Sequence, residues 1–125
     1  MIKRIAFLLL VLLISTSVHG GEIAGVDVPE TINKADGTVL QLNGAGIRSK
    51  LFFKIYVAEL YLAEKKSEAS AIFEDDSDRR LVMHFLYDEV GKEDLVEAWN
   101  DGFQGNGTPE QLTGLSSQID TFNSF

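Results

Sequence analysis

The chain lacks cysteine, has few basic residues and contains no long hydrophobic run. Without cysteine it has no disulfide scaffold, no cysteine-ligated zinc or iron–sulfur site and no thiol nucleophile. Its 11 Lys and Arg face 19 Asp and Glu. The formal net charge of −8 argues against a nucleic-acid partner, because affinity for phosphate backbones rests on clustered cations. The apolar run of ten at residues 5–14 is too short for a bilayer core of about 30 Å, so we expect no permanent membrane span.

Residues 1–20 have the pattern of a secretory signal peptide. Lys3 and Arg4 precede the apolar run, and small residues follow it up to Gly20, the expected cleavage position. Cleavage there removes two basic and no acidic residues, so the net charge changes from −8 to −10. We therefore expect a periplasmic or secreted protein that folds without disulfides, with a retained N-terminal anchor as the alternative.

Residues 21–125 read as one domain without linkers or repeats. The residues that follow the signal predict four strands and three helices: strands at Glu22–Pro29, Val39–Leu42, Leu51–Leu62 and Leu81–Tyr87, and helices at Ser67–Phe73, Lys92–Phe103 and from Thr108 onward. The strand at Leu51–Leu62 is apolar on both faces except at Lys54 and Glu59, which is typical of a central strand. This order indicates an α+β fold, an antiparallel sheet with helices on one face.

Several local signals mark where elements begin and end. Asn33–Gly37 has turn chemistry, and the glycine-rich stretch Asn43–Gly46 predicts a tight bend. Ser67 is expected to cap the first helix, and Thr108 begins the last one with a proline at N1 and a capping-box glutamine. The last helix reaches Phe125 with no return strand after it, so we expect the domain to be incomplete at its C-terminus.

The familiar catalytic and metal-binding motifs are missing from this sequence. It has no Gly-x-Ser-x-Gly elbow, no His-x-x-x-His pair and no P-loop. His84 is mid-strand, where a packed or solvent-facing role is typical, and Glu74–Asp78 lacks calcium-loop spacing and so indicates a solvated turn. Trp99 lies on the apolar face of its helix and is expected in the core. We expect neither a metal nor a cofactor.

Arg48 is the residue that this sequence singles out. It follows the glycine-rich stretch and precedes the most apolar strand, where an unpaired cation is costly. One interpretation is a rim arginine paired with a carboxylate; the other is an anchor for a ligand carboxylate or enolate, with the Tyr56 hydroxyl beside it. On one straight strand the two residues would lie about 26 Å apart, so a shared ligand requires a chain reversal near Ser49–Lys50.

The stretch Leu42–Lys50, followed by Phe52–Leu62, resembles the chalcone isomerase-like superfamily, most closely its exported bacterial branch. The resemblance implies an open-faced β-sandwich, with an antiparallel sheet packed against a layer of helices and a ligand cleft between them. In catalytic plant members the matching arginine helps to stabilise the flavonoid and a threonine orders a water. In the fatty-acid-binding members an arginine and a tyrosine hold the carboxylate. Here Arg48 matches the arginine, and Tyr56 replaces the threonine.

The resemblance also bears on catalysis. The isomerases use a tyrosine and an asparagine on the helix that corresponds to Lys92–Phe103, but those positions fall at Asp94 and Asp101 here. Two carboxylates would repel an anionic chalcone phenolate. The expectation is a monomeric, non-catalytic binder of a small hydrophobic carboxylate such as a fatty acid. The alternative is an isomerase, an intramolecular lyase of chalcone–flavanone type, so enzymatic activity stays open. Family domains are longer, with further strands after the last helix.

Overall fold

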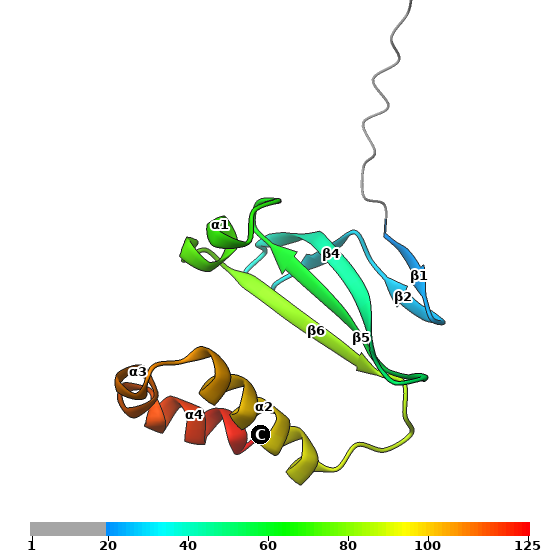
Figure 1. The fold of residues 1–125 in the computed structure, drawn as a ribbon. Coiled ribbons are helices and arrows are strands. Elements are labelled where there is room, and N and C mark those ends of the chain that lie inside the picture. Colours follow the sequence, from blue (N-terminus) through cyan, green and yellow to red (C-terminus); the bar gives the residue numbers. More distant parts are fainter. Residues whose placement is uncertain (1–19) are drawn as a thin grey trace, which may run out of the picture. The chain divides into compact units, whose positions relative to one another are not determined.

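The structure, a computed structural model, describes residues 20–125, so the predicted signal lies outside the described residues apart from Gly20. The described chain contains six strands and four helices: β1 (Gly21–Ile23), β2 (Val26–Val28), β3 (Thr31–Asn33), β4 (Val39–Lys50), β5 (Phe53–Leu62), α1 (Ala69–Glu74), β6 (Arg79–Phe85), α2 (Lys92–Asn106), α3 (Pro109–Gly114) and α4 (Ser116–Asn123). Figure 1 labels most of these elements. The expected α+β class is confirmed. No helix within residues 20–125 is long and apolar enough to cross a membrane.

The strands form two sheets. β1 and β2 make an antiparallel hairpin, and the second sheet has the order β3-β4-β5-β6, which gives β5 a neighbour on each side, as its two apolar faces predicted. The described chain divides into two compact units. One contains residues 20–47 and 57–83, and the other contains residues 48–56 and 84–125.

The segment Glu22–Pro29 is a hairpin and not the single strand predicted. Ile23 pairs with Val26, and the two residues between them have positive φ, 50° at Ala24 and 80° at Gly25. Two positive φ angles give a turn whose twist suits paired strands. The sequence did not reveal the turn because alanine rarely adopts this conformation.

The stretch Asn43–Gly46 is extended within β4, so the predicted tight bend is wrong. The strand expected at Val39–Leu42 is present and continues to Lys50. The chain reverses later, at Leu51 and Phe52, where Leu51 has a φ of 53°. Pairing with the neighbouring strands overrides the weak local preference of the glycines, since strand propensity depends strongly on context.

The core of the first unit is built from alternate residues of β4 and β5. Five of its six buried hydrophobic side chains come from these strands and the sixth, Val28, comes from β2; the six are Val28, Leu40, Leu42, Val57, Tyr61 and Leu62. Glu59, which interrupts the apolar pattern of β5, lies on this buried face and is only 2% exposed. A buried carboxylate is costly without hydrogen bonds, and Glu59 Oε2 accepts one from the Tyr61 hydroxyl at 2.7 Å.

Short polar segments complete this unit. The turn predicted at Asn33–Gly37 is confirmed by the bond from Lys34 N–H to Thr38 C=O and by a φ of 87° at Gly37. The predicted first helix is present but begins at Ala69, and its N-cap is Glu68 without a side-chain bond, so the Ser67 cap is wrong. The acidic turn is also confirmed, and its Asp78 accepts a 2.6 Å hydrogen bond from Lys34 Nζ.

The second unit contains the three later helices. α2 begins at Lys92 as predicted and continues to Asn106, beyond the expected end at Phe103. The capping box at Thr108 is confirmed in both directions, with Gln111 N–H donating to Thr108 Oγ1 at 3.2 Å and Thr108 N–H donating to Gln111 Oε1 at 2.9 Å. The last helix, predicted as one piece, divides at Leu115 into α3 and α4.

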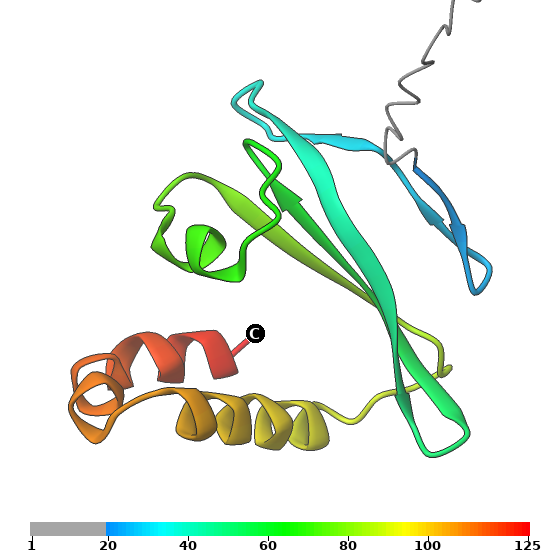
Figure 2. The ribbon, with the colours of Figure 1, turned by 45° about the horizontal axis from the view of Figure 1, so that its top comes forward.

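Aromatic rings join α2 to α4 within this unit. The Phe122 ring lies 4.7 Å from the ring of Trp99 and 5.7 Å from that of Phe103, centroid to centroid. Trp99 is half-buried, so it packs against α4 as an apolar-face residue should, without being fully enclosed. Figure 2 shows α2 and α4 side by side.

Candidate ligand-binding site

The reversal between β4 and β5 brings Arg48 and Tyr56 together. The turn at Leu51 and Phe52 lies two residues beyond the position that the shared-ligand hypothesis required. The guanidinium carbon of Arg48 is 5.9 Å from the centroid of the Tyr56 ring, within the range of a cation–π contact. The separation of about 26 Å expected on a straight strand is therefore replaced by direct contact.

Phe85 extends this pair onto a third strand. Its ring lies 5.5 Å from the Tyr56 ring, edge to face at 70°, and both rings are half-buried. The hydrogen bond from Leu86 N–H to Ile55 C=O, 3.0 Å long, aligns the end of β6 with β5 at this level. Arg48, Tyr56 and Phe85 thus form a row from β4 through β5 to β6, which holds the tyrosine ring between a cation and an apolar ring.

The polar atoms of this row have no protein partners among residues 20–125. No carboxylate there pairs with Arg48, and the Tyr56 hydroxyl makes no hydrogen bond with any of these residues. Among the Lys and Arg side chains of residues 20–125 only Lys34 and Lys66 form ion pairs, so what distinguishes Arg48 is its contact with a tyrosine ring. Five N–H donors in a planar fork beside a hydroxyl suit a carboxylate ligand.

The second tyrosine of β5 has the opposite surroundings. The Tyr61 hydroxyl lies 2.7 Å from Glu59 Oε2 and 2.9 Å from the carbonyl oxygen of Pro29, and it shares its one proton between these acceptors. Burial raises the pKa of the Tyr61 hydroxyl above its ordinary value of 10.0, and the hydrogen bond to Glu59 raises it further. These hydrogen bonds are buried within the first unit, and the one to Pro29 attaches the segment that precedes β3 to strand β5.

Asp94 and Asp101, the α2 residues that the resemblance aligned with the catalytic tyrosine and asparagine, have different environments. Asp94 lies in the first turn of the helix, where a negative charge is stabilised by the helix dipole. Asp101 lines an open groove of about 630 Å³ between α2 and α4, together with Glu93 and Glu97. These three carboxylates, spaced four residues apart, outnumber the one cation of the lining, Lys92, so the groove has an excess of negative charge that does not suit an anionic ligand.

The structure gives no catalytic or metal-binding arrangement to His84 or to the acidic turn Glu74–Asp78 within residues 20–125. His84 lies on β6 as predicted and is exposed. Within residues 20–125 no group of three or more His, Asp or Glu side chains could hold a metal ion. Asp75 accepts hydrogen bonds from the backbone and hydroxyl of Ser77, which stabilises the acidic turn itself.

The family model described as chalcone isomerase-like matches residues 20–125 of this chain. The chain belongs to the chalcone isomerase-like family. Its α+β architecture, with an antiparallel sheet and four helices, agrees with that assignment. No curated protein and no solved structure matched the chain.

Phe85 is the residue of this row that sequence reasoning missed. Its place in a predicted strand was clear, but a strand pattern does not say which side chain of a neighbouring strand it will contact. Arg48 and Tyr56 were singled out by their side-chain chemistry, and the family resemblance then matched Arg48 to a ligand-binding arginine. Predicting the contact of Phe85 would have required the register between β5 and β6.

Proposed function

We propose that this member of the chalcone isomerase-like family is an exported, monomeric, non-catalytic binder of a small hydrophobic carboxylate such as a fatty acid. Arg48 holds the carboxylate through its guanidinium fork, and the Tyr56 hydroxyl donates a further hydrogen bond. The observation that carries this proposal is the pairing of Arg48 with Tyr56, with no carboxylate of residues 20–125 engaging the guanidinium.

The chemistry of the pair favours binding over turnover. A guanidinium and a phenol can neutralise and orient a carboxylate, but neither group is a ready general base at neutral pH. By the sequence resemblance, Tyr56 also replaces the threonine that orders a water in the catalytic plant members. In a chain with a net charge of −8, a guanidinium that no carboxylate of residues 20–125 neutralises is a favourable point for an anion.

The alternative function is an isomerase of the chalcone–flavanone type. Membership of the family and the presence of Arg48 support it. By the sequence resemblance, Asp94 and Asp101 replace the catalytic tyrosine and asparagine, and two carboxylates would repel a chalcone phenolate. We therefore rank this function second.

Lipid extraction from the purified full chain tests the proposal directly. We expect mass spectrometry to detect a bound fatty acid, and dodecanoate added to the delipidated protein to bind in a calorimetric titration. Replacing Arg48 by Ala should weaken binding about 10- to 150-fold, the usual worth of a charged hydrogen bond. Arg80→Ala on β6 is the matched control, because Arg80 is also an exposed strand arginine.

Three results decide between the two functions. An empty protein that binds no fatty acid, or equal affinity in the Arg48→Ala protein, would contradict the binder. A decrease of chalcone absorbance faster than the buffer blank, abolished by Arg48→Ala, would establish the isomerase instead. Export is checked separately, by sequencing the N-terminus of the protein recovered outside the cytoplasm, where we expect Gly21 to come first.

A further inference from the structure

The turn between β4 and β5 exposes three consecutive large apolar side chains. Leu51 is 86% exposed, Phe52 98% and Phe53 61%. The backbone N–H of Leu86, the first residue after β6, bonds to Ile55 C=O, and Figure 2 shows the β4–β5 turn projecting past the end of β6. Three adjacent apolar side chains at the end of a two-stranded projection are unusual on a soluble surface, where exposed apolar residues are normally scattered.

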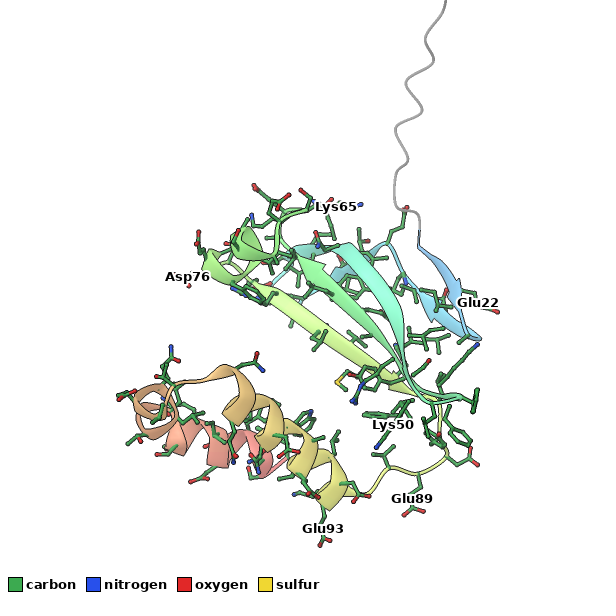
Figure 3. All side chains as sticks on the ribbon, viewed as in Figure 1. Glu22, Lys50, Lys65, Asp76, Glu89 and Glu93 are labelled. Atoms are coloured by element: carbon green, nitrogen blue, oxygen red, sulfur yellow. The ribbon has the colours of Figure 1, made fainter. Side chains whose placement is uncertain are left out.

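Cations flank these side chains on both strands. Lys50 precedes Leu51, Lys54 follows Phe53, and Arg48 lies two residues further along β4; Figure 3 labels Lys50 beside the turn. No acidic residue occurs between Asp36 and Glu59, although the chain as a whole has a net charge of −8. The turn therefore joins an apolar tip to a local positive charge in an otherwise acidic protein.

The backbone of the tip is also held at a cost. Leu51 has a φ of 53°, a left-handed conformation that glycine or asparagine adopts more easily than leucine. Strand pairing alone would be better served by one of those residues at this turn. A strained leucine at an 86% exposed position points to a role for the side chain outside the hairpin.

We propose that this tip, Lys50–Lys54, docks on the surface of a lipid bilayer that contains anionic lipids. Leu51, Phe52 and Phe53 enter the boundary between head groups and acyl chains. Lys50 and Lys54 remain at the level of the head-group phosphates, as long basic side chains at an interface do. This inference goes beyond the proposed function and holds whether or not Arg48 binds a carboxylate.

The size of the tip favours a bilayer over a protein partner. Large side chains of this kind bury up to about 250 Å² each, so three offer less than the roughly 800 Å² per partner of a standard protein interface. A bilayer needs no complementary surface, and its negative surface potential attracts the flanking lysines. A second copy of this chain is the competing occupant, and the experiment below distinguishes it.

The absence of cysteine allows a probe to be placed at the tip alone. The full chain carrying Phe52→Cys is labelled with an environment-sensitive NBD fluorophore, and Phe73→Cys, at a 79% exposed position on α1, is the matched control. With vesicles of phosphatidylglycerol and phosphatidylcholine we expect a blue shift at position 52 and none at position 73. Spin-labelled lipid should quench the probe at position 52, and added salt should weaken the response.

Variants then separate the apolar and the charged contributions. In the labelled protein, Leu51→Asn with Phe53→Ser should weaken vesicle binding at least about tenfold, because two large side chains no longer enter the interface. Lys50→Glu with Lys54→Glu should weaken it about 30-fold at low salt, whereas Lys65→Glu, outside the tip, should leave it unchanged. Thermal melts of each variant check that the fold is retained. If a double variant does not fold, the labelled Phe52→Cys protein still tests the proposal by itself.

Three results would overturn the proposal. The first is no shift at position 52 while the labelled protein sediments with vesicles. The second is an equal response to vesicles of pure phosphatidylcholine. The third is a shift that appears without vesicles as the protein concentration rises, which would assign the tip to a second copy of the chain.

Discussion

Two tyrosines five residues apart on β5 show how differently one strand can use the same side chain. Tyr61 is fully buried, and its hydroxyl binds Glu59 and the Pro29 carbonyl. Tyr56 is half-buried between Arg48 and Phe85, and its hydroxyl has no partner among residues 20–125. The Tyr61 hydroxyl therefore stabilises the fold, whereas the Tyr56 hydroxyl can bind a ligand.

The charged residues near them differ in the same way. Glu59 is 2% exposed and accepts a hydrogen bond from Tyr61, so its carboxylate stabilises the interior of the first unit. Arg48 is exposed and meets no carboxylate within the described residues, so its donors remain free for an anion. Whether a polar side chain already has a hydrogen-bond or ion-pair partner in the protein therefore separates structural from candidate binding residues better than burial alone.

The largest expected effect comes from truncating Tyr61. Tyr61→Ala should lower the free energy of unfolding by about 3–5 kcal/mol, because it removes a large buried side chain and leaves a cavity. Tyr56→Ala should cost less than half as much, since its ring is only half-buried. Urea unfolding of the three proteins measures both values. Equal losses would remove the contrast between the two positions.

Removing only the hydroxyl groups sharpens the contrast further. Tyr61→Phe should lower the free energy of unfolding by about 1–3 kcal/mol, because buried acceptors lose their donor, and should leave ligand affinity unchanged. Tyr56→Phe should leave stability unchanged and weaken fatty-acid binding about 2- to 10-fold. Chemical denaturation and calorimetry on the same samples report both quantities. The reverse pattern would exchange the roles assigned to the two residues.

Alkaline pH should affect Tyr61 selectively. Because burial and the bond to Glu59 raise the folded-state pKa of Tyr61, the unfolded chain loses this proton first as the pH rises past 10.0. The stability contribution is complete below that pH and is lost above it. Melting temperatures measured across this range should fall more steeply for the native protein than for Tyr61→Phe. Parallel curves would show that Tyr61 titrates alike in both states.

The smallest effect is expected at the exposed turns of the same unit. Hydrogen bonds from Thr38 lower the pKa of Asp36 to about 2, and bonds from Ser77 lower that of Asp75 to about 2. Their contribution is complete above pH 4 and is lost as the pH falls through the folded-state values. Asp36→Asn should therefore flatten the acid limb of the stability curve slightly. An unchanged acid limb would contradict this assignment.

The sequence predicted best where one local interaction decides the structure. The capping box at Thr108 and the turn at Asn33–Gly37 depend on neighbouring residues only, and both were placed correctly. The positions that failed depend on partners distant in the chain. The glycines in Asn43–Gly46 are straightened by pairing across the sheet, and the hairpin before Pro29 contains a strained Ala24 that no propensity favours.

The candidate site could be predicted in part for the same reason. Arg48 and Tyr56 are eight residues apart, so one reversal joins them, and the chemistry of the two side chains made that reversal worth expecting. Phe85 comes from β6, and its contact depends on strand register, which the pattern of alternating residues leaves open. Glu59 stood out only as an interruption of the apolar pattern, because its bond to Tyr61 requires knowing which face of β5 is buried.

The most direct test of the central claim follows the ligand's own carboxyl group. Dodecanoate labelled at its carboxyl carbon is bound to the native protein and to Arg48→Ala, and its NMR shift is recorded as the pH is changed. Beside the guanidinium the bound carboxyl should titrate below its pKa in water, and in Arg48→Ala this lowering should disappear. The same titration in both proteins would contradict the assignment of Arg48 as the residue that holds the head group.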